Sequence, residues 1–327
     1  MKKRWKFLVA ALAVAGGVWL NNSSMLTSPM PACPLKILAH RGVHQTFPLD
    51  EVENDTCTAK LIRPPTHQFV ENTIASMRAA FAAGADVVEL DVHLTPDKKF
   101  AVFHDWTLDC RTNGHGVTEE TPIAVLKTLD VGFGYTADGG KTFPVRGLGQ
   151  GAMPTLDEVF EAMPNRRFLI NFKSNRAEEG EALAAMLKAN SEYRAAVFGV
   201  YGGGPPTRAA LANLEGLKGY DRTSASGCLM HYGLLGWTGY VPESCRNTLV
   251  IVPVNYARYF WGWPRLFEKR MAKAGSDVIL LGPYGSGGFS SGLDTELETE
   301  SIPRGFTGLV WTNRIETIGP LLKAKDN

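Results

Sequence analysis

The sequence predicts an α/β protein folded as a (β/α)8 TIM barrel, and three observations support this prediction. Short apolar, β-branched runs alternate with amphipathic helical patterns, there are eight such runs, and they extend over roughly 290 residues, which suits a barrel with insertions. A doubly wound open sheet shares the alternation. The barrel is favoured because polar residues directly follow the apolar runs, where barrel enzymes carry their chemistry.

Each expected strand is a short run rich in Val, Ile, Leu or Phe, flanked by turn-forming or polar residues. In chain order the strands are residues 36–39, 86–92, 100–103, 167–172, 195–201, 248–254, 277–281 and 308–312. Between them, apolar residues recur at a spacing of three and four, which predicts helices. The clearest of these helical patterns are residues 71–83, 156–163, 178–189 and 264–274.

The N-terminal segment differs in charge from the rest of the chain. This 327-residue protein has 34 Lys and Arg residues, and four of them lie between positions 2 and 6, whereas the first 24 residues contain none of the 33 acidic residues. The remaining body is therefore slightly acidic. It gives no electrostatic reason to expect a nucleic-acid partner. The apolar and charged fractions, 44% and 20%, also exclude a disordered chain.

Phe7 to Leu20 is an uncharged apolar run of fourteen residues directly after the basic cluster. The run is shorter than the roughly 17 to 25 residues of a typical membrane span, and no clean A-x-A cleavage motif follows it. We expect residues 1–30 to be an uncleaved, single-pass signal anchor that places the domain formed by residues 31–327 on the periplasmic or extracellular side of the cell membrane. A cleaved signal peptide, with secretion to the periplasm, is the alternative.

Ionisable residues gather at the ends of three predicted strands. His40 and Arg41 follow the first strand, Glu89 and Asp91 share one face at the end of the second, and His104 follows the third. Two carboxylates that project together repel each other unless a cation lies between them, and oxygen ligands suit Mg²⁺ or Ca²⁺. An imidazole shuttles protons near neutral pH, and a guanidinium binds phosphate through parallel hydrogen bonds. The pattern predicts a metal-assisted acid–base site.

These residues belong to a longer series of motifs that closely resembles the glycerophosphodiester phosphodiesterase family, within the superfamily of phospholipase C-like phosphodiesterases with TIM barrels. The resemblance extends over most of residues 35–325, and it is strong in the first half and loose between residues 200 and 300. The matching text is His40-Arg41-Gly42, Glu71-Asn72-Thr73, Gly84-Ala85-Asp86, Glu89-x-Asp91-Val92, Thr95-x-Asp97, His104-Asp105-x-x-Leu108, Arg111-Thr112, Gly116, Pro154-Thr155-Leu156-x-Glu158-Val159, Lys173 and Val310-Trp311-Thr312-Asn313.

The resemblance implies a metal-dependent hydrolase that cleaves glycerophosphodiesters to sn-glycerol 3-phosphate and an alcohol. It implies that His40 and His104 are the acid–base pair and that Arg41 and Lys173 contact the phosphate. Glu89, Asp91 and the residue at position 171 would hold a divalent metal, Mg²⁺ or Ca²⁺. Trp311, at the end of the last strand, is either a substrate contact or part of the core. Glu71 is either a helix-start residue or part of the site, and His93 is either a metal ligand or part of the rim. The aromatic residues between 256 and 263 either border an apolar pocket or membrane interface, or pack a loop against the core.

The sequence departs from the family pattern in the third metal ligand. The family usually has a carboxylate two residues before the lysine, and this chain has Asn171 in Asn171-Phe172-Lys173. An amide oxygen can ligate Mg²⁺ or Ca²⁺, but the site has one negative charge fewer and should bind its cation less tightly. We therefore expect the substrate phosphate to help recruit the metal.

A second departure is the long segment between the first two motifs, where we expect residues 43–70 to form an extended loop on the catalytic face. This loop carries Cys57, and Cys110 interrupts the family's spacing after His104. A disulfide between Cys57 and Cys110 would hold the loop over the site. Cys228 and Cys245 would form a second disulfide and leave Cys33 unpaired.

The combined prediction is an exported phosphodiesterase whose partners are a glycerophosphodiester or phospholipid and, through the N-terminal segment, the membrane. Two alternatives remain open. One is a phospholipase D or lysophospholipase that acts on membrane lipids. The other is a non-catalytic barrel that binds phospholipid head groups, in which Asn171 marks lost catalysis.

Overall fold

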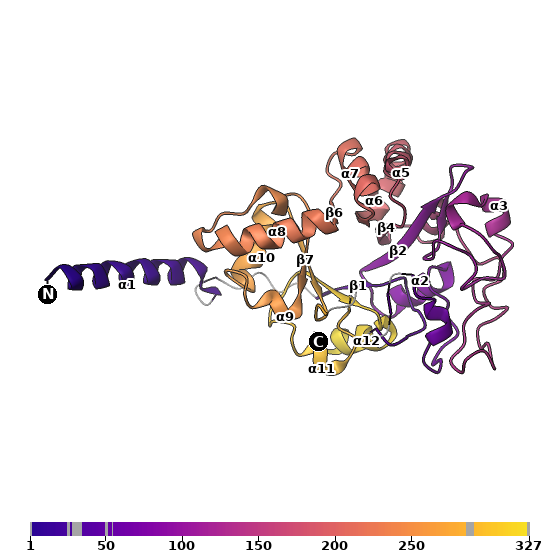
Figure 1. Cartoon of the computed structure of the whole chain (residues 1–327), viewed down its shortest axis with the longest axis horizontal. Coiled ribbons are helices and arrows are strands. Elements are labelled where there is room, and N and C mark those ends of the chain that lie inside the picture. The colour runs from indigo at the N-terminus through magenta and orange to yellow at the C-terminus, as the bar shows by residue number, and fades with distance from the viewer. Residues whose placement is uncertain are drawn as a thin grey trace.

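The strands form one parallel sheet that curls into a nearly closed barrel with helices packed around it (Figure 1). The computed structural model describes residues 2–24, 27, 35–49, 52–53, 55–285 and 291–325. Within these residues, the barrel strands follow the order β6-β5-β4-β2-β1-β9-β8-β7, which confirms the predicted barrel. Their bounds are β1 Lys36–Ala39, β2 Val87–Leu94, β4 Arg167–Phe172, β5 Val197–Gly202, β6 Gly219–Asp221, β7 Leu249–Pro253, β8 Asp277–Leu281 and β9 Leu309–Thr312.

Several of the connecting helices begin at a residue whose side chain caps the helix. Thr73 accepts a hydrogen bond from the Ser76 backbone at 3.2 Å, and Thr155 forms a reciprocal capping box with Glu158. The helix bounds are α1 Lys2–Asn22, α2 Ile74–Ala82, α3 Ile123–Leu126, α4 Leu156–Ala162, α5 Ala177–Ala189, α6 Ser191–Ala196, α7 Gly204–Asn213, α8 Arg222–Leu235, α9 Val254–Ala257, α10 Arg265–Lys273, α11 Glu296–Thr299 and α12 Ile315–Lys325; the short 3-10 turns are η2 Thr58–Leu61, η3 Thr118–Glu120, η4 Gly236–Thr238 and η5 Glu243–Cys245.

Two strands differ from the prediction. Residues 100–102 do form a strand, β3 (Phe100–Val102), but it pairs antiparallel with β2 and is not part of the barrel wall. The eighth strand of the wall is β6, whose three residues Gly-Tyr-Asp carry no apolar run that a sequence pattern could detect. No ladder joins β6 to β7 within the described residues. The Thr248 hydroxyl bridges this seam by donating to the Gly219 carbonyl at 2.6 Å.

The alternation along β2 decides which side chains point into the barrel. Val88, Leu90 and Val92 pack with the core between sheet and helices. The residues between them, Glu89 and Asp91, therefore face the barrel interior, and each is fully buried. A smaller apolar cluster that includes Leu38, Ile279 and Trp311 fills the interior. The polar site is thus built on top of this inner cluster.

A second, separate core lies beneath the segment between β3 and α4. Leu108, Leu126 and Val145 from this segment pack against Ala59 and Val70 of the long loop after β1. Both predicted disulfides are present. Cys57–Cys110 joins the loop to this segment, and Cys228–Cys245 joins α8 to η5. Cys33 lies outside the described residues.

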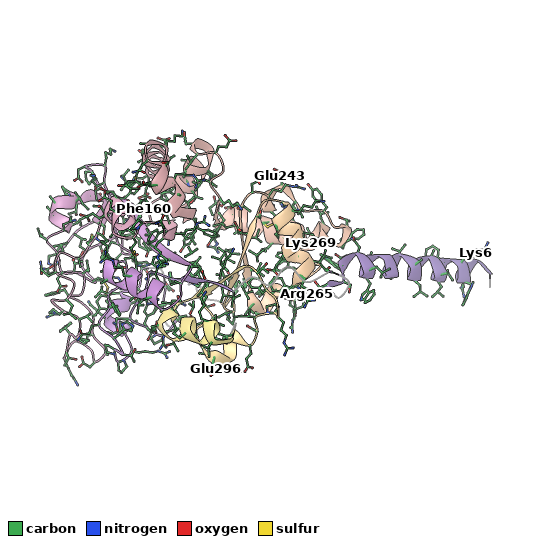
Figure 2. All side chains as sticks on the ribbon, turned by 180° about the vertical axis from the view of Figure 1, so that it is seen from behind. Lys6, Phe160, Glu243, Arg265, Lys269 and Glu296 are labelled. Atoms are coloured by element: carbon green, nitrogen blue, oxygen red, sulfur yellow. A yellow bond between two sulfur atoms is a disulfide. The ribbon has the colours of Figure 1, made fainter. Side chains whose placement is uncertain are left out.

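Helix α1 projects away from the barrel, and Figure 2 shows side chains on both sides of most of its length clear of the barrel, with Lys6 near the far end. Its C-terminal end is attached to the barrel by polar contacts. The Asn21 and Asn22 side chains donate to the Trp237 carbonyl at 3.0 and 2.8 Å, and Arg270 donates to the Asn22 side chain at 3.0 Å. Among the helices of the described residues, none is long and apolar enough to cross a membrane.

Candidate active site

The predicted site residues meet at the C-terminal ends of neighbouring strands. The strand register aligns Asp91 of β2 with Asn171 of β4, and Asn171 with Tyr201 of β5. His40 follows β1 directly, and its ring centroid lies 5.1 Å from that of Trp311 on β9. These side chains come from strands at the middle of the sheet order, so the whole wall supports them.

The turn after β1 has an unusual backbone. Arg41 and Gly42 both have positive φ angles, 56° and 79°. Residues other than glycine rarely adopt this backbone conformation. A Cβ atom on Gly42 would lie 2.6 Å from the Ser76 hydroxyl. The turn is stabilised by the Asn72 backbone, which donates to the Arg41 carbonyl at 3.1 Å. This conformation turns the Arg41 side chain back toward the carboxylates of β2.

His40 is held in one orientation by a chain of hydrogen bonds. Asn313 donates through its side-chain amide to Asp294 at 2.8 Å, which leaves the Asn313 carbonyl oxygen facing His40 Nδ1 at 2.6 Å. His40 therefore carries its proton on Nδ1, and its Nε2 lone pair faces the site. Burial, aided by the nearby Arg41 and His44, lowers the pKa of His40 well below its usual value, so the ring is neutral.

His104 has the same arrangement with a different partner. Its Nδ1 lies 2.6 Å from one oxygen of Asp105, and the other oxygen of Asp105 accepts a hydrogen bond from Arg111 Nε at 2.9 Å. Burial and then the positive charges of Arg41 and Lys173 lower the pKa of His104 well below its usual value. The two histidines are therefore both neutral, and the Nε2 atom of each accepts no hydrogen bond from the described residues.

The two carboxylates of β2 differ in charge because their neighbours differ. Asp91 lies 3.3 Å from Arg41 Nε and 3.8 Å from Lys173 Nζ. Although burial opposes it, these cations lower the pKa of Asp91. Glu89 accepts from the Tyr201 hydroxyl at 2.7 Å and from the Arg41 backbone at 3.0 Å. Burial, followed by repulsion from Asp91, raises the pKa of Glu89 well above its usual value. The pair holds one proton near neutral pH.

The donor set suits a divalent cation only in part. Within the described part of the chain, no three or more His, Cys, Asp or Glu side chains are grouped so as to hold a metal ion. Glu89 and Asp91 supply two buried carboxylates, whose shared proton a cation could replace. Asn171 donates its amide hydrogen to Asp91 at 2.8 Å, so its nitrogen rather than its oxygen faces the carboxylate. The ligand role of Asn171 remains a prediction that requires the amide to turn.

Several residues of the site have roles that the sequence did not identify. Asn313 and Asp105 stood in recognised motifs without an assigned function, and Tyr201 and Asp294 had no signal because their partners are distant in the chain. His93, left open by the sequence, is fully buried behind the site, with Nε2 3.4 Å from the His104 carbonyl. It therefore supports the His104 backbone.

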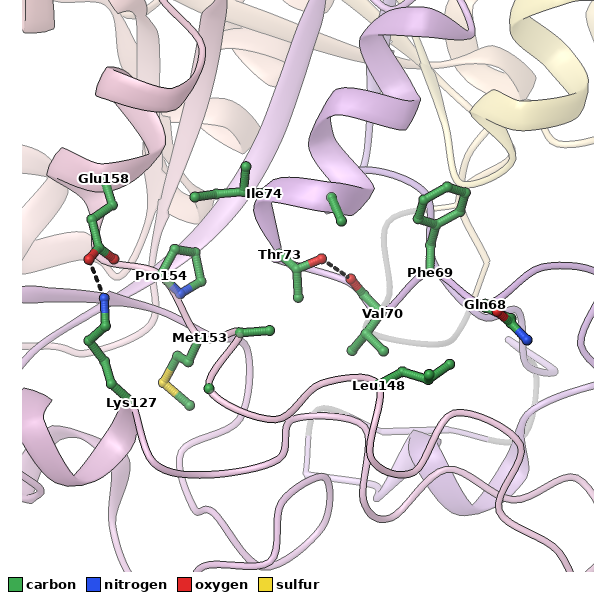
Figure 3. Close-up of a pocket in the computed structure, with 13 residues that line it drawn as sticks. Gln68, Phe69, Val70, Thr73, Ile74, Lys127, Leu148, Met153, Pro154 and Glu158 are labelled. Atoms are coloured by element: carbon green, nitrogen blue, oxygen red, sulfur yellow. Dashed lines mark hydrogen bonds and ion pairs between the residues drawn. The ribbon is translucent and has the colours of Figure 1, made fainter.

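A cavity of about 470 Å³ lies away from this site (Figure 3). It is bordered by the long loop at Phe69 and Val70, by the start of α2 and by Met153. Lys127 and Glu158 form an ion pair at one side, and the Thr73 hydroxyl donates to the Val70 carbonyl at 2.8 Å. None of the predicted catalytic residues lines this cavity.

Comparison with known proteins gives a family for the segment that carries most of the site. Residues 40–200 match the model of the glycerophosphoryl diester phosphodiesterase family. This match covers just under half of the chain. A glycerophosphodiester phosphodiesterase of Caldanaerobacter subterraneus is 40% identical over 103 residues, which are 32% of this chain and 39% of the relative. A human lysophospholipase D is 32% identical over 138 residues, 40% of each chain. The alignments thus span about two fifths of these relatives.

Solved phosphodiesterase structures share the fold over nearly the whole chain. The phosphodiesterase domain of an uncharacterised Mycobacterium tuberculosis protein covers 88% of this chain and 99% of its own, with a TM-score of 0.61 and 17% identity. An Oleispira antarctica phosphodiesterase, solved with its product sn-glycerol 3-phosphate, covers 89% and 97% with a TM-score of 0.55 and 20% identity. At these identities the likeness establishes the barrel fold.

Replacing Glu89 with Gln should change how stability depends on pH. Because the pKa of Glu89 is raised, the folded protein binds this proton more tightly than the unfolded chain, whose carboxyl titrates near 4.5. The wild type therefore loses stability as the pH rises from the pKa of the unfolded chain toward the raised pKa of the folded protein. In the presence of EDTA, the free energy of unfolding of Glu89→Gln minus that of wild type should increase between about pH 5 and pH 8. Urea unfolding at each pH measures this difference.

Tyr201→Phe is the companion variant. The Tyr201 hydroxyl stabilises the charged carboxylate of Glu89, so its removal should raise the pKa further and extend the loss of stability to higher pH. A stability difference between Glu89→Gln and wild type that stays constant with pH would contradict the shared proton.

Proposed function

We propose that this protein is a glycerophosphodiester phosphodiesterase that hydrolyses its substrate to sn-glycerol 3-phosphate and an alcohol. The observation that carries the proposal is the pair of neutral histidines, His40 and His104. Each is oriented through Nδ1, its Nε2 accepts no hydrogen bond within the described part of the chain, and the buried cations Arg41 and Lys173 lie nearby. The family of residues 40–200, the Caldanaerobacter relative and the product complex of the Oleispira enzyme support the same substrate class.

The residues of the site suit in-line hydrolysis of a phosphodiester. Arg41 and Lys173 bind the phosphoryl oxygens, and the bound negative charge favours protonation of one of the two imidazoles. The neutral imidazole removes a proton from the attacking water through Nε2, the water oxygen bonds to phosphorus, and the bond to the alcohol oxygen breaks. The protonated imidazole gives its proton to that oxygen. The two histidines then exchange protonation states with solvent for the next turnover.

A divalent cation, Mg²⁺ or Ca²⁺, would be held by Glu89 and Asp91 at the same place. It would supply positive charge to the phosphoryl oxygens as negative charge develops there. Arg41 and Lys173 already occupy one side of Asp91, at 3.3 and 3.8 Å, so the cation must compete with them. This competition supports weak binding in the absence of substrate.

A second candidate, hydrolysis of lysophospholipids, is favoured by one surface feature. Tyr256, Tyr259 and Tyr284 are exposed after β7 and β8, at the same end of the barrel as the site. The rings of Tyr256 and Tyr284 lie 6.4 Å apart. Exposed aromatic rings of this kind suit an acyl chain or a lipid interface. The human relative named lysophospholipase D is consistent with this candidate.

The activity test compares variants on glycerophosphocholine and lysophosphatidylcholine. His40→Ala and His104→Ala should each lower the rate roughly 10²- to 10⁴-fold, because each removes one proton-transfer group. His115→Ala is the matched control, since His115 is exposed and pairs only with Asp109 among the described residues. It should retain the wild-type rate. The product is measured enzymatically: sn-glycerol 3-phosphate from glycerophosphocholine, and lysophosphatidic acid from lysophosphatidylcholine.

The comparison between substrates decides between the candidates. Turnover of glycerophosphocholine alone supports the first, and preferential turnover of the lyso-lipid supports the second. A folded wild type that cleaves neither substrate, with or without added Mg²⁺ or Ca²⁺, would contradict both and support a binding barrel.

Replacing Asn171 with Glu should restore a third carboxylate beside Glu89 and Asp91. The added negative charge should tighten binding of Ca²⁺ or Mg²⁺ in the absence of substrate, as measured by calorimetry. Asn213→Glu, on the exposed face of α7, adds the same charge away from the site and serves as the control. An unchanged dissociation constant for Asn171→Glu would argue against position 171 as part of the metal site.

For cellular location, we infer export, with residues 1–30 retained as the attachment to the membrane. The paired cysteines support an oxidising compartment. The basic cluster at residues 2–6 and the exposed apolar side chains of α1, such as Phe7 and Leu12, support contact with lipid. This proposal keeps a cleaved, secreted form as its alternative.

Fractionation of expressing cells tests the location. The protein should be recovered with membranes, with an N-terminal sequence that begins before residue 25, and should be released as soluble protein when residues 1–30 are replaced by a cleavable signal peptide. A soluble mature protein that starts near residue 25 would show instead that the leader is removed.

A further inference from the structure

Arg111 is the most completely coordinated charged side chain next to the candidate site. It is 2% exposed and lies in the segment between β3 and α4. Its guanidinium donates to Asp105 from Nε at 2.9 Å, to Glu71 and Tyr135 from Nη1 at 3.1 and 2.7 Å, and to Thr58 from Nη2 at 2.7 Å. Four acceptors from four parts of the chain therefore fix the plane of this one group.

Two of these contacts connect Arg111 to residues of the candidate active site. Asp105 uses its second oxygen to hold His104 Nδ1 at 2.6 Å, so the orientation of the imidazole depends on the same carboxylate that Arg111 fixes. Glu71 uses its second oxygen to accept from Arg41 Nη1 at 3.0 Å. The phosphate-binding arginine and the histidine are thus joined through Arg111 by the buried carboxylate of Glu71 and the partly exposed carboxylate of Asp105. The network contains two positive and two negative side chains.

The other side of Arg111 is held by the long loop after β1. Thr58, which accepts from Arg111, directly follows Cys57, and Arg111 directly follows Cys110. The Cys57–Cys110 disulfide and the Thr58–Arg111 hydrogen bond therefore connect the same two dipeptides, Cys57-Thr58 and Cys110-Arg111. A covalent bond and a hydrogen bond lie next to each other, and together they determine where the guanidinium lies.

We propose that Arg111 is a positioning residue for His104, and that the Cys57–Cys110 disulfide holds Arg111 in place for this task. Arg111 contacts no reacting atom. It fixes Asp105, Asp105 fixes the tautomer and the ring plane of His104, and the disulfide and Thr58 fix Arg111. This inference rests on the proposed function, in which His104 transfers a proton.

A merely structural role for Arg111 predicts something different. If it only neutralised the carboxylates of Glu71 and Asp105, lysine would serve, because it brings the same charge. Lysine has three donors on a single nitrogen and cannot reach four acceptors in one plane. The positioning role therefore predicts that Arg111→Lys keeps the fold but loses the orientation of His104.

The test measures steady-state kinetics and the Nδ1 proton of His104. Arg111→Lys should lower kcat roughly 10- to 100-fold, the usual effect of removing a group that orients a catalytic ligand, with a much smaller change in KM. In ¹⁵N-histidine-labelled protein, the downfield Nδ1 proton signal of His104 should shift or broaden. Thr58→Ser should retain wild-type values because it keeps the hydroxyl, whereas Thr58→Val should shift toward Arg111→Lys.

The two disulfides of the chain provide a matched comparison for the second part of the proposal. The double variant Cys57→Ser/Cys110→Ser should lower kcat and disturb the His104 signal in the same direction as Arg111→Lys. Cys228→Ser/Cys245→Ser removes a disulfide that joins α8 to η5 and has no contact with Arg111. It should lose stability with an unchanged kcat and an unchanged signal.

The outcomes separate this inference from the proposed function. A folded Arg111→Lys protein with wild-type kcat, or with an unmoved His104 signal, would overturn the positioning role. Equal effects of the two disulfide variants on the His104 signal would overturn the link to Cys57–Cys110. Because the proton signal is recorded without substrate, it tests the inference even if the wild type cleaves neither test substrate.

Discussion

The site depends on one electrostatic constraint, the presence of two buried carboxylates on the same face of β2. Glu89 and Asp91 are both fully buried, and two charges of the same sign cannot both persist there without compensation. The protein meets this constraint by two means. It places Arg41 and Lys173 against Asp91, and it leaves a proton on Glu89. The strained turn at Arg41, the register of β4 beside β2 and the hydroxyl of Tyr201 all serve this balance.

The pairing of buried charges continues outward from the site. Arg41 is shared between Asp91 and Glu71, and Glu71 is shared between Arg41 and Arg111. Each buried ion thus has more than one partner, which is what makes burial of an ion tolerable. The consequence is rigidity, because moving one member of the network breaks its contacts with more than one oppositely charged side chain. A site of this kind is organised before substrate arrives.

The sequence was sufficient for the barrel and for the meeting of His40, Glu89, Asp91 and His104, because these depend on local apolar patterns and on motifs that stand directly after strands. Both expected disulfides are present, but cysteine spacing alone does not determine connectivity. It was insufficient for β6, whose three residues are defined only by their neighbours in the sheet. The strand at 100–103 exists, but its direction follows from a short turn after β2 that its composition does not encode. The partners of His40 and Glu89, namely Asn313 with Asp294 and Tyr201, lie far along the chain, and only tertiary structure could select them. Asn171 shows the same limit, since its position was foreseen but the orientation of its amide was not.

The incomplete closure of the barrel between β6 and β7 affects where the protein is free to fluctuate. In the order of the sheet, β2 and β1 occupy the two central places, so the open seam is as far from them as the barrel allows. Local opening requires few broken hydrogen bonds at the seam and many at the centre. The Cys228–Cys245 bond joins the elements on either side of the seam, and this limits how far it can part. Local opening of the barrel wall is therefore expected on the side opposite the histidines, where it does not change the distances needed for proton transfer.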